Sequence, residues 1–225
     1  VEAGANQRAS NVIYDREFSA ISLTGPEEYD FDAALVGVGH IHITGITPAL
    51  SEKAFLSTLE LAKKAKAAGI KVSCDLNYRK KLWNWRPEMK KHDLAEHCMS
   101  QIVPYVDLVI ANEEDAADVF GIKAGNSSVT SGRIDVEGYK SVARQIIDRF
   151  DNVTQVAITL RESISASHNN WGAMLFDRAS DEAFLAPLDA DGNYSPYEIR
   201  DIVDRVGGGD KAITPAPAPM YIVEQ

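Results

Sequence analysis

Cysteine is scarce in this sequence: Cys74 and Cys98 are the two cysteines in 225 residues, and they stand far apart. Two cysteines at this separation form neither a disulfide framework nor the close pairs of a structural zinc site. No apolar run reaches the length of a membrane span, and no signal peptide is visible. We therefore expect a cytoplasmic protein with two reduced thiols and no membrane contact.

Positive charge is also in short supply. Lys and Arg number 23 against 33 Asp and Glu, which gives a formal net charge of −10. Nucleic-acid binding relies on clustered Lys and Arg, so this balance argues against a nucleic-acid partner. A small molecule that carries phosphate needs only a local site and remains compatible with it. The chain is 45% hydrophobic and 25% charged, and it is long enough for one large domain with a sizeable core.

Apolar strands alternate with amphipathic helices along most of the chain. Residues 8–23 predict a strand or hairpin, residues 33–45 a strand buried on both faces, and residues 70–78 and 153–160 two further strands. "VDLVIANEEDAADVFG" predicts a strand that runs into a short helix at Asn112. One helix should begin at Ser51 and end at Gly69, another should follow Asn112, and "YKSVARQIIDRF" should form a third. "WGAMLFD" and "EAFLAP" predict an antiparallel pair. This order predicts an α/β fold with a mostly parallel sheet and helices on both of its faces.

Polar side chains directly follow three of the predicted strands. The clusters are Asp75 to Arg79, Asn112 to Asp115 and Thr159 to Ser163. In parallel sheets ligands bind at the carboxyl ends of the strands, so these clusters should line one edge. Polar residues also stand wherever loops begin, and this plainer interpretation stays open for each cluster. His40 and His42 lie within a buried type of strand, so hydrogen-bonded core histidines are the simpler interpretation of that pair.

Three consecutive glycines, Gly207 to Gly209, precede the carboxylate of Asp210. Glycines let the backbone approach a ligand closely, and free N–H groups at a helix start favour an anion. A carboxylate beside such an anion hole can accept a proton from a hydroxyl that attacks a phosphoryl group. A flexible glycine-rich linker that happens to precede an aspartate is the alternative, because lone glycine motifs are weak signals.

Several segments resemble a known family when they are taken in order. "DRVGGGD" resembles the D-T-x-G-A-G-D signature of the ribokinase-like, or PfkB, sugar kinases, and "ANEED" resembles their N-x-x-E region. "NQRASNVIYDR", "HITGITPALS", "DLNYRKKLW" and "TLRESISAS" are similar to bacterial 2-keto-3-deoxygluconate kinases. The resemblance runs from about Gly4 to Asp210. It implies a ribokinase-like three-layer α/β/α fold with β-lid strands near the N-terminus. It also implies ATP-dependent phosphorylation of the C6 hydroxyl of a keto-deoxy sugar acid, with Mg²⁺ on the nucleotide.

The resemblance also implies roles for individual residues. Asp210 would be the catalytic base, and Gly207, Gly208 and Gly209 would form the anion hole. Tyr14 and Arg16 match the family's Y-x-R on the lid and, with Arg79, would hold the sugar acid. Asn77, Asn112, Thr159, Arg161 and Ser163 would line the nucleotide site, and Asp115 would reach the metal indirectly, through water. Lid strands in this family often pair across dimers, so a homodimer is implied as well.

The chemistry of the arginines agrees with an acidic substrate. A guanidinium grips a carboxylate or phosphate with two parallel hydrogen bonds, which an ammonium cannot do. Arg79 ends a predicted buried strand, so a merely solvated charge is the weaker interpretation there. For Arg16 that interpretation stays open. Neither residue distinguishes a gluco from a galacto configuration.

The sequence departs from the family pattern at three places. Asp115 stands where the family has Glu, the family's first strands would precede Val1, and Pro215, Pro217 and Pro219 cannot continue the helix expected after Asp210. We therefore expect a chain that is truncated at both ends. Its parts would be a partial lid (residues 1–25), an incomplete core (26–210) and an atypical proline-rich tail (211–225). A non-catalytic remnant that binds or pairs, or a kinase for another sugar, are the alternative functions.

Overall fold

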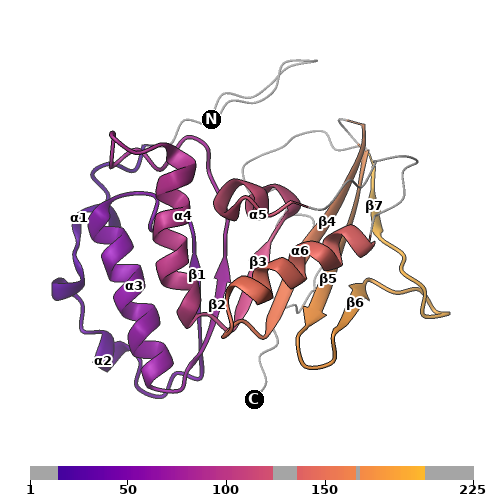
Figure 1. The fold of residues 1–225 in the computed structure, drawn as a ribbon, viewed down its shortest axis with the longest axis horizontal. Coiled ribbons are helices and arrows are strands. Elements are labelled where there is room, and N and C mark those ends of the chain that lie inside the picture. The colour runs from indigo at the N-terminus through magenta and orange to yellow at the C-terminus, as the bar shows by residue number, and fades with distance from the viewer. Residues whose placement is uncertain (1–14, 124–135, 166–167, 201–225) are drawn as a thin grey trace.

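The computed structural model describes residues 15–123, 136–165 and 168–200. A seven-stranded sheet runs through this part of the chain (Figure 1). Its strands are β1 (His40–Thr44), β2 (Lys71–Asp75), β3 (Leu108–Ala111), β4 (Gln155–Ser165), β5 (His168–Asp177), β6 (Glu182–Ala186) and β7 (Tyr197–Ile199). Strands β1 to β4 pair in parallel and in sequence order. Strand β5 is antiparallel to β4, and both β6 and β7 pair with β5.

The long helices lie in one layer against this sheet (Figure 1). They are α3 (Glu52–Ala67), α4 (Lys91–Ile102), α5 (Glu113–Phe120) and α6 (Val136–Arg149). Two short helices, α1 (Ala20–Leu23) and α2 (Phe31–Ala34), and a 3₁₀ turn, η1 (Pro26–Glu28), pack against α3, while a second 3₁₀ turn, η2 (Val103–Tyr105), follows α4. Side chains that alternate along the strands towards this layer form the core, among them Val72, Cys74, Val109, Val156 and Ile158. The predicted α/β sheet is confirmed.

Local signals fix the helix ends as the sequence predicts. The Ser51 hydroxyl accepts a hydrogen bond from the Ala54 N–H at 3.0 Å, which caps the start of α3. After this helix, Gly69 adopts a left-handed φ of 74°, a conformation that glycine reaches without strain. Asn112 caps α5 in the same way by accepting from the Asp115 N–H. These caps confirm the predicted helices at Ser51 and Asn112.

Two predicted strands are wrong in part. Residues 15–23, the described part of the predicted 8–23 strand, form a turn and α1, because the Ser22 hydroxyl donates locally to the carbonyls of Glu17 and Ser19. The predicted 33–45 strand begins only at His40, since residues 33–34 end α2 and Gly37 turns the chain with a φ of 73°. Strand β1 is also not buried on both faces, because His40 and His42 are exposed.

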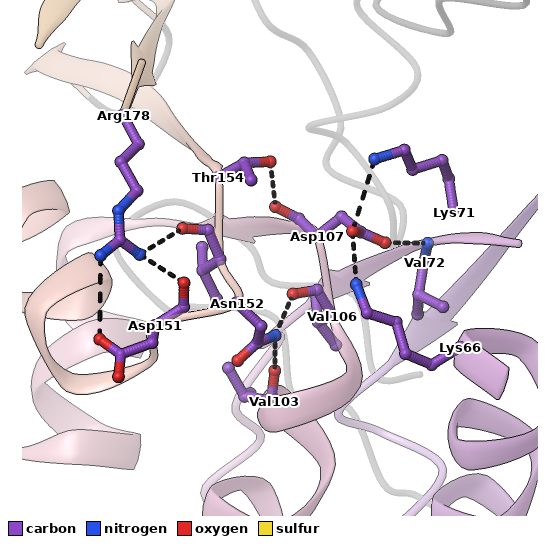
Figure 2. A network of polar contacts seen from close by, with 11 residues as sticks. Lys66, Lys71, Val72, Val103, Val106, Asp107, Asp151, Asn152, Thr154 and Arg178 are labelled. Carbon is purple, nitrogen blue, oxygen red and sulfur yellow. Dashed lines mark hydrogen bonds and ion pairs between the residues drawn. The ribbon is translucent and has the colours of Figure 1, made fainter. Parts of the chain in front are cut away.

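A polar network closes the edge of the sheet at which β2, β3 and β4 begin (Figure 2). The Asp107 carboxylate accepts from Lys66 Nζ at 2.7 Å and from the Val72 N–H at 2.9 Å, and Lys71 Nζ lies 3.6 Å away. Its backbone carbonyl accepts from the Thr154 N–H and hydroxyl. Asp107 thereby connects three neighbouring strands. Buried polar groups are tolerated only where they have hydrogen-bond partners, and here each one has such a partner. We therefore infer that the polar network at this edge stabilises the fold.

The ionisation of Asp107 predicts how stability depends on pH. Burial alone would raise the pKa of this carboxyl, but the hydrogen bonds from Lys66 and Val72 and the nearby charges of Lys66 and Lys71 outweigh it and lower the pKa below its ordinary value. A carboxyl whose pKa is lowered by folding stabilises the folded state at pH values above its ordinary pKa, which is near 4. This contribution to the free energy of unfolding is lost as the pH falls through the folded-state pKa. We expect Asp107→Asn to lower the free energy of unfolding by about 1–3 kcal/mol at pH 7.

Urea unfolding of the two chains between pH 2 and pH 7 measures this effect. The difference between them should shrink towards zero below pH 4. Asp32→Asn, which breaks the exposed ion pair with Lys64, is the matched control and should change little. A difference that stays constant over the whole pH range would contradict the role of the Asp107 charge.

Candidate functional site

The carboxyl ends of β1 and β2 meet in close backbone contact. The Gly45 N–H donates to the Asp75 carbonyl at 2.8 Å, and a Cβ added to Gly45 would stand 2.0 Å from the Leu76 carbonyl oxygen. Beyond this contact, the Asn77 amide donates to the Thr44 hydroxyl at 3.3 Å. Asn77 has a φ of 40°, in the left-handed region that asparagine tolerates better than most residues. The two strand ends are therefore joined so that the chain after Leu76 turns away from the sheet.

Asp115 joins this turn to the next strand end. Its carboxylate accepts from the Tyr78 N–H at 2.9 Å and from the Asn112 N–H at 3.3 Å, while the Asn112 side chain accepts from the Asp115 N–H at 2.7 Å. Only 5% of Asp115 is exposed, and burial raises the pKa of its carboxyl to about 6. Both carboxylate oxygens are thus occupied by backbone donors. In the described ranges, no group of three His, Cys, Asp or Glu side chains could hold a metal ion.

Arg79 follows this anchored turn directly. It is half-buried, its guanidinium donates to the Tyr78 carbonyl at 3.3 Å, and its charge acts on the Asp115 carboxyl. On its other side the chain is fixed by tryptophans. The backbone N–H of Trp83 donates to the Ala49 carbonyl at 3.1 Å, and the indole N–H of Trp85 donates to the Pro48 carbonyl at 3.0 Å. Both tryptophans pack against the core, and 1% of Trp83 is exposed.

Strand β4 brings Thr159 to the same edge. The register aligns Ala111 with Ile158, so Thr159 lies at the level of Asn112, the residue after Ala111. Thr159 and Arg161 are exposed and share the sheet face away from α6. The guanidinium of Arg161 lies 5.1 Å from the Trp171 ring centre and donates to Asn169 at 3.2 Å. The backbone of Ser163 pairs with Asn169 in the β4–β5 ladder.

The structure thus brings together Asn77, Arg79, Asn112, Asp115 and Thr159 at one sheet edge. The predicted strand end at Thr159 is wrong, because β4 continues to Ser165 by pairing with β5, and Thr159 lies where the parallel pairing with β3 ends. Arg16 is exposed in the turn before α1, and α1 is held beside the start of α3 by the Ser51 hydroxyl, which donates to the Ser22 carbonyl at 2.6 Å. Tyr14, Gly207, Gly208, Gly209 and Asp210 lie outside the described residues. The described groups offer amide, hydroxyl and guanidinium donors, which suit an anionic ligand.

Sequence reasoning missed Thr44 and Gly45. The signal for Gly45 was present, because a glycine directly after an apolar strand often marks a close approach of two backbones. The partner of that approach, the carbonyl of Leu76, is 31 residues further along the chain and could not be read from the sequence. Thr44 gave no signal at all, since threonine is common in strands.

Substitution at Gly45 tests the close contact of the two strand ends. We expect Gly45→Ala to lower the free energy of unfolding by about 1–3 kcal/mol, because the methyl group would force two backbones apart. Gly39→Ala is the matched control, because Gly39 directly precedes β1 as Gly45 directly follows it. A Cβ at Gly39 would meet nothing within 4 Å, and the residue is exposed. Equal denaturation midpoints for the two variants would contradict the contact.

Comparison with known proteins shows a consistent set of relatives. No protein-family model matches the sequence. A 2-dehydro-3-deoxygalactonokinase of Haloferax volcanii is 35% identical over 131 residues, which are 58% of this chain and 39% of that protein. The crystal structure of a 2-dehydro-3-deoxygluconokinase from Thermotoga maritima superposes with a TM-score of 0.73 at 39% identity. The superposition covers 92% of this chain and 55% of the Thermotoga maritima chain.

A PfkB-family carbohydrate kinase from Listeria grayi gives a TM-score of 0.70 at 31% identity, over 93% of this chain and 56% of its own. The chain therefore spans little more than half the length of the solved relatives that it matches. The resemblance to the PfkB-family carbohydrate kinases and the ribokinase-like fold are both confirmed. Within the described residues, the helices are too short or too polar to cross a membrane.

Proposed function

We propose that this chain, a relative of the PfkB-family carbohydrate kinases, binds a 2-keto-3-deoxy sugar acid and takes part in its phosphorylation by ATP. The observation that carries this proposal is the placement of Arg79. Its loop is anchored by Asp115 on one side and by Trp83 and Trp85 on the other. Because the backbone on both sides of Arg79 is anchored, less conformational freedom is lost on binding, and the guanidinium can grip a carboxylate with two hydrogen bonds. A neutral sugar would give such a group no partner of opposite charge.

The proposed substrates include sugar acids of more than one configuration. One relative is named for the gluco acid and another for the galacto acid. The two acids differ in the orientation of one hydroxyl, while the carboxylate is common to both. Because Arg79 would bind the common carboxylate, we propose that the chain accepts both acids, with 2-keto-3-deoxy-D-gluconate phosphorylated at its C6 hydroxyl.

The remaining roles follow the resemblance. Asp210 would take the proton of the attacking hydroxyl, and the amides of Gly207 to Gly209 would stabilise the charge that develops on the phosphoryl group. Tyr14 and Arg16 would close over the sugar acid, and lid segments of two copies would pair as a homodimer. The nucleotide would be lined by Asn77, Asn112, Thr159, Arg161 and Ser163. Mg²⁺ would neutralise the phosphates, with Asp115 reaching it only through water.

Replacement of Arg79 tests the sugar-acid site. Arg79→Lys keeps the charge but loses the planar pair of donors, so we expect affinity for the keto-deoxy acid to weaken by roughly 1–3 kcal/mol. Isothermal titration calorimetry on the 225-residue chain measures this. Lys80→Ala, which removes the exposed charge next in sequence, is the control and should leave affinity nearly unchanged. Equal losses for the two variants would indicate general attraction by charge.

Phosphoryl transfer itself is tested with γ-labelled ATP, Mg²⁺ and each acid. The expected result is labelled sugar acid above the protein-free background, and its loss in Asp210→Asn with acid binding retained. Labelled ATP reveals even slow turnover, so the test does not depend on an ordinary kinase rate. Binding without any transfer would contradict the kinase proposal and leave a sugar-acid binding module.

A further inference from the structure

His40 and His42 form a two-imidazole cluster on the face of β1 away from the helix layer. Residues two apart on a strand point to the same side, and the parallel register aligns His42 with Ser73 of β2. His40 Nε2 and His42 Nδ1 each lie 2.9 Å from the Ser73 hydroxyl oxygen. The two ring nitrogens therefore converge on one atom and are separated by at most twice that distance.

The surroundings of this cluster suit a cation from solvent. Both imidazoles are exposed to solvent, whereas Ser73 is buried, with 2% of its surface exposed. The Ser73 hydroxyl therefore lies beneath two rings that solvent can reach. The nearest ammonium along β2, on Lys71, is directed to Asp107 at 3.6 Å. Asp75 alternates to the same face of β2 and adds negative charge near the cluster. The formal net charge of −10 attracts cations in general.

We propose that His40 and His42 bind a divalent transition-metal ion, of which Zn²⁺ is the physiological example. Neutral imidazole is a preferred ligand of Zn²⁺, Ni²⁺ and Cu²⁺, with Zn–N distances of about 2.0–2.1 Å. A hydroxyl has one proton, so Ser73 can donate to one ring and accept from the other. Metal binding requires a lone pair on both facing nitrogens, which a change of tautomer in one ring supplies without any change of charge. The described residues bring no third His, Cys, Asp or Glu into such a group, so Ser73 and water would complete the coordination.

This site differs from the Mg²⁺ of the proposed kinase reaction in its chemistry and its partners. Mg²⁺ prefers oxygen ligands and holds its water tightly, so two imidazoles should discriminate against it. Affinity should follow the order of divalent metals for nitrogen ligands, with Cu²⁺ above Zn²⁺ and Ni²⁺. Neither ATP nor a sugar acid is needed for the proposed metal ion to bind.

Zinc titration of the 225-residue chain tests the proposal. Calorimetry should give one saturable Zn²⁺ site that millimolar Mg²⁺ does not displace. His40→Ala and His42→Ala should each weaken it more than tenfold. His97→Ala is the matched control, because His97 is exposed on α4, away from the cluster, and should leave the affinity unchanged.

Ring ¹⁵N NMR of the unsubstituted chain gives a second readout that needs no variant. Zn²⁺ should shift Nε2 of His40 and Nδ1 of His42 and leave the rings of His97 and His168 in place. The proposal is overturned if no saturable binding occurs, if the double His40 and His42 variant binds as tightly as the parent, or if Zn²⁺ shifts other imidazoles instead.

Discussion

Asp115→Ala should destabilise the chain by about 2–5 kcal/mol and loosen the loop that carries Arg79. The variant removes the acceptor of two backbone donors, the N–H groups of Tyr78 and Asn112, at a position where 5% of the side chain is exposed. Each buried donor left without a partner costs about 1–3 kcal/mol. The bond from the Asn112 N–H is at the same time half of the reciprocal pair that caps α5.

Urea denaturation of the variant and its parent measures this loss, and Glu114→Ala is the control. Glu114 is the preceding residue of the same helix and is exposed, so its removal should leave the midpoint within experimental scatter. Amide hydrogen exchange adds a local readout, since the Tyr78 and Asn112 N–H groups should exchange faster in Asp115→Ala. Unchanged protection of both amides would show that the carboxylate does not hold the two strand ends together.

Trp83→Ala should have an effect of similar size, about 3–5 kcal/mol, which is typical for a buried tryptophan. Trp83 is among the largest fully buried side chains, and its backbone has a left-handed φ of 64°, which a bulky residue adopts only when its surroundings impose it. Its loss would empty a large volume beneath the loop, whereas the backbone N–H of residue 83 could still donate to the Ala49 carbonyl.

Lys81→Ala is the comparison for this variant, because Lys81 is exposed in the same loop. Thermal unfolding should show a large drop in melting temperature for Trp83→Ala and a small change for Lys81→Ala. If Trp83→Ala melts within about 2 °C of the parent chain, the loop is not held by this side chain.

The sequence predicted those parts of the fold that depend on local signals. Ser51 and Asn112 cap helices through atoms within three residues, and Gly69 ends a helix by its own backbone freedom. Such interactions leave a mark in any short window of sequence. The strand-end rule then placed Asn77 and Asn112 at one edge without knowledge of their contacts, and Thr159 reached that edge from within β4.

The sequence could not predict contacts between distant segments. Asp115 was singled out for a metal, yet its carboxylate accepts from Tyr78, 37 residues earlier in the chain, and this partner is set by the placement of the first turn of α5 beside the loop that follows β2. The exposure of His40 and His42 was missed for a similar reason. An apolar run indicates burial on average, whereas the exposed face of β1 depends on what lies beside that strand.

Mapping of backbone amides by NMR tests for a sugar-acid site at Arg79 without relying on turnover, because it locates the bound acid. The ¹⁵N-labelled chain is titrated with 2-keto-3-deoxygluconate, and with fructose as the neutral control. We expect saturable shifts at the Gly45, Asn77 and Arg79 amides with the acid, and none with fructose. Shifts confined to residues outside this edge of the sheet, or equal shifts with fructose, would contradict a sugar-acid site organised around Arg79.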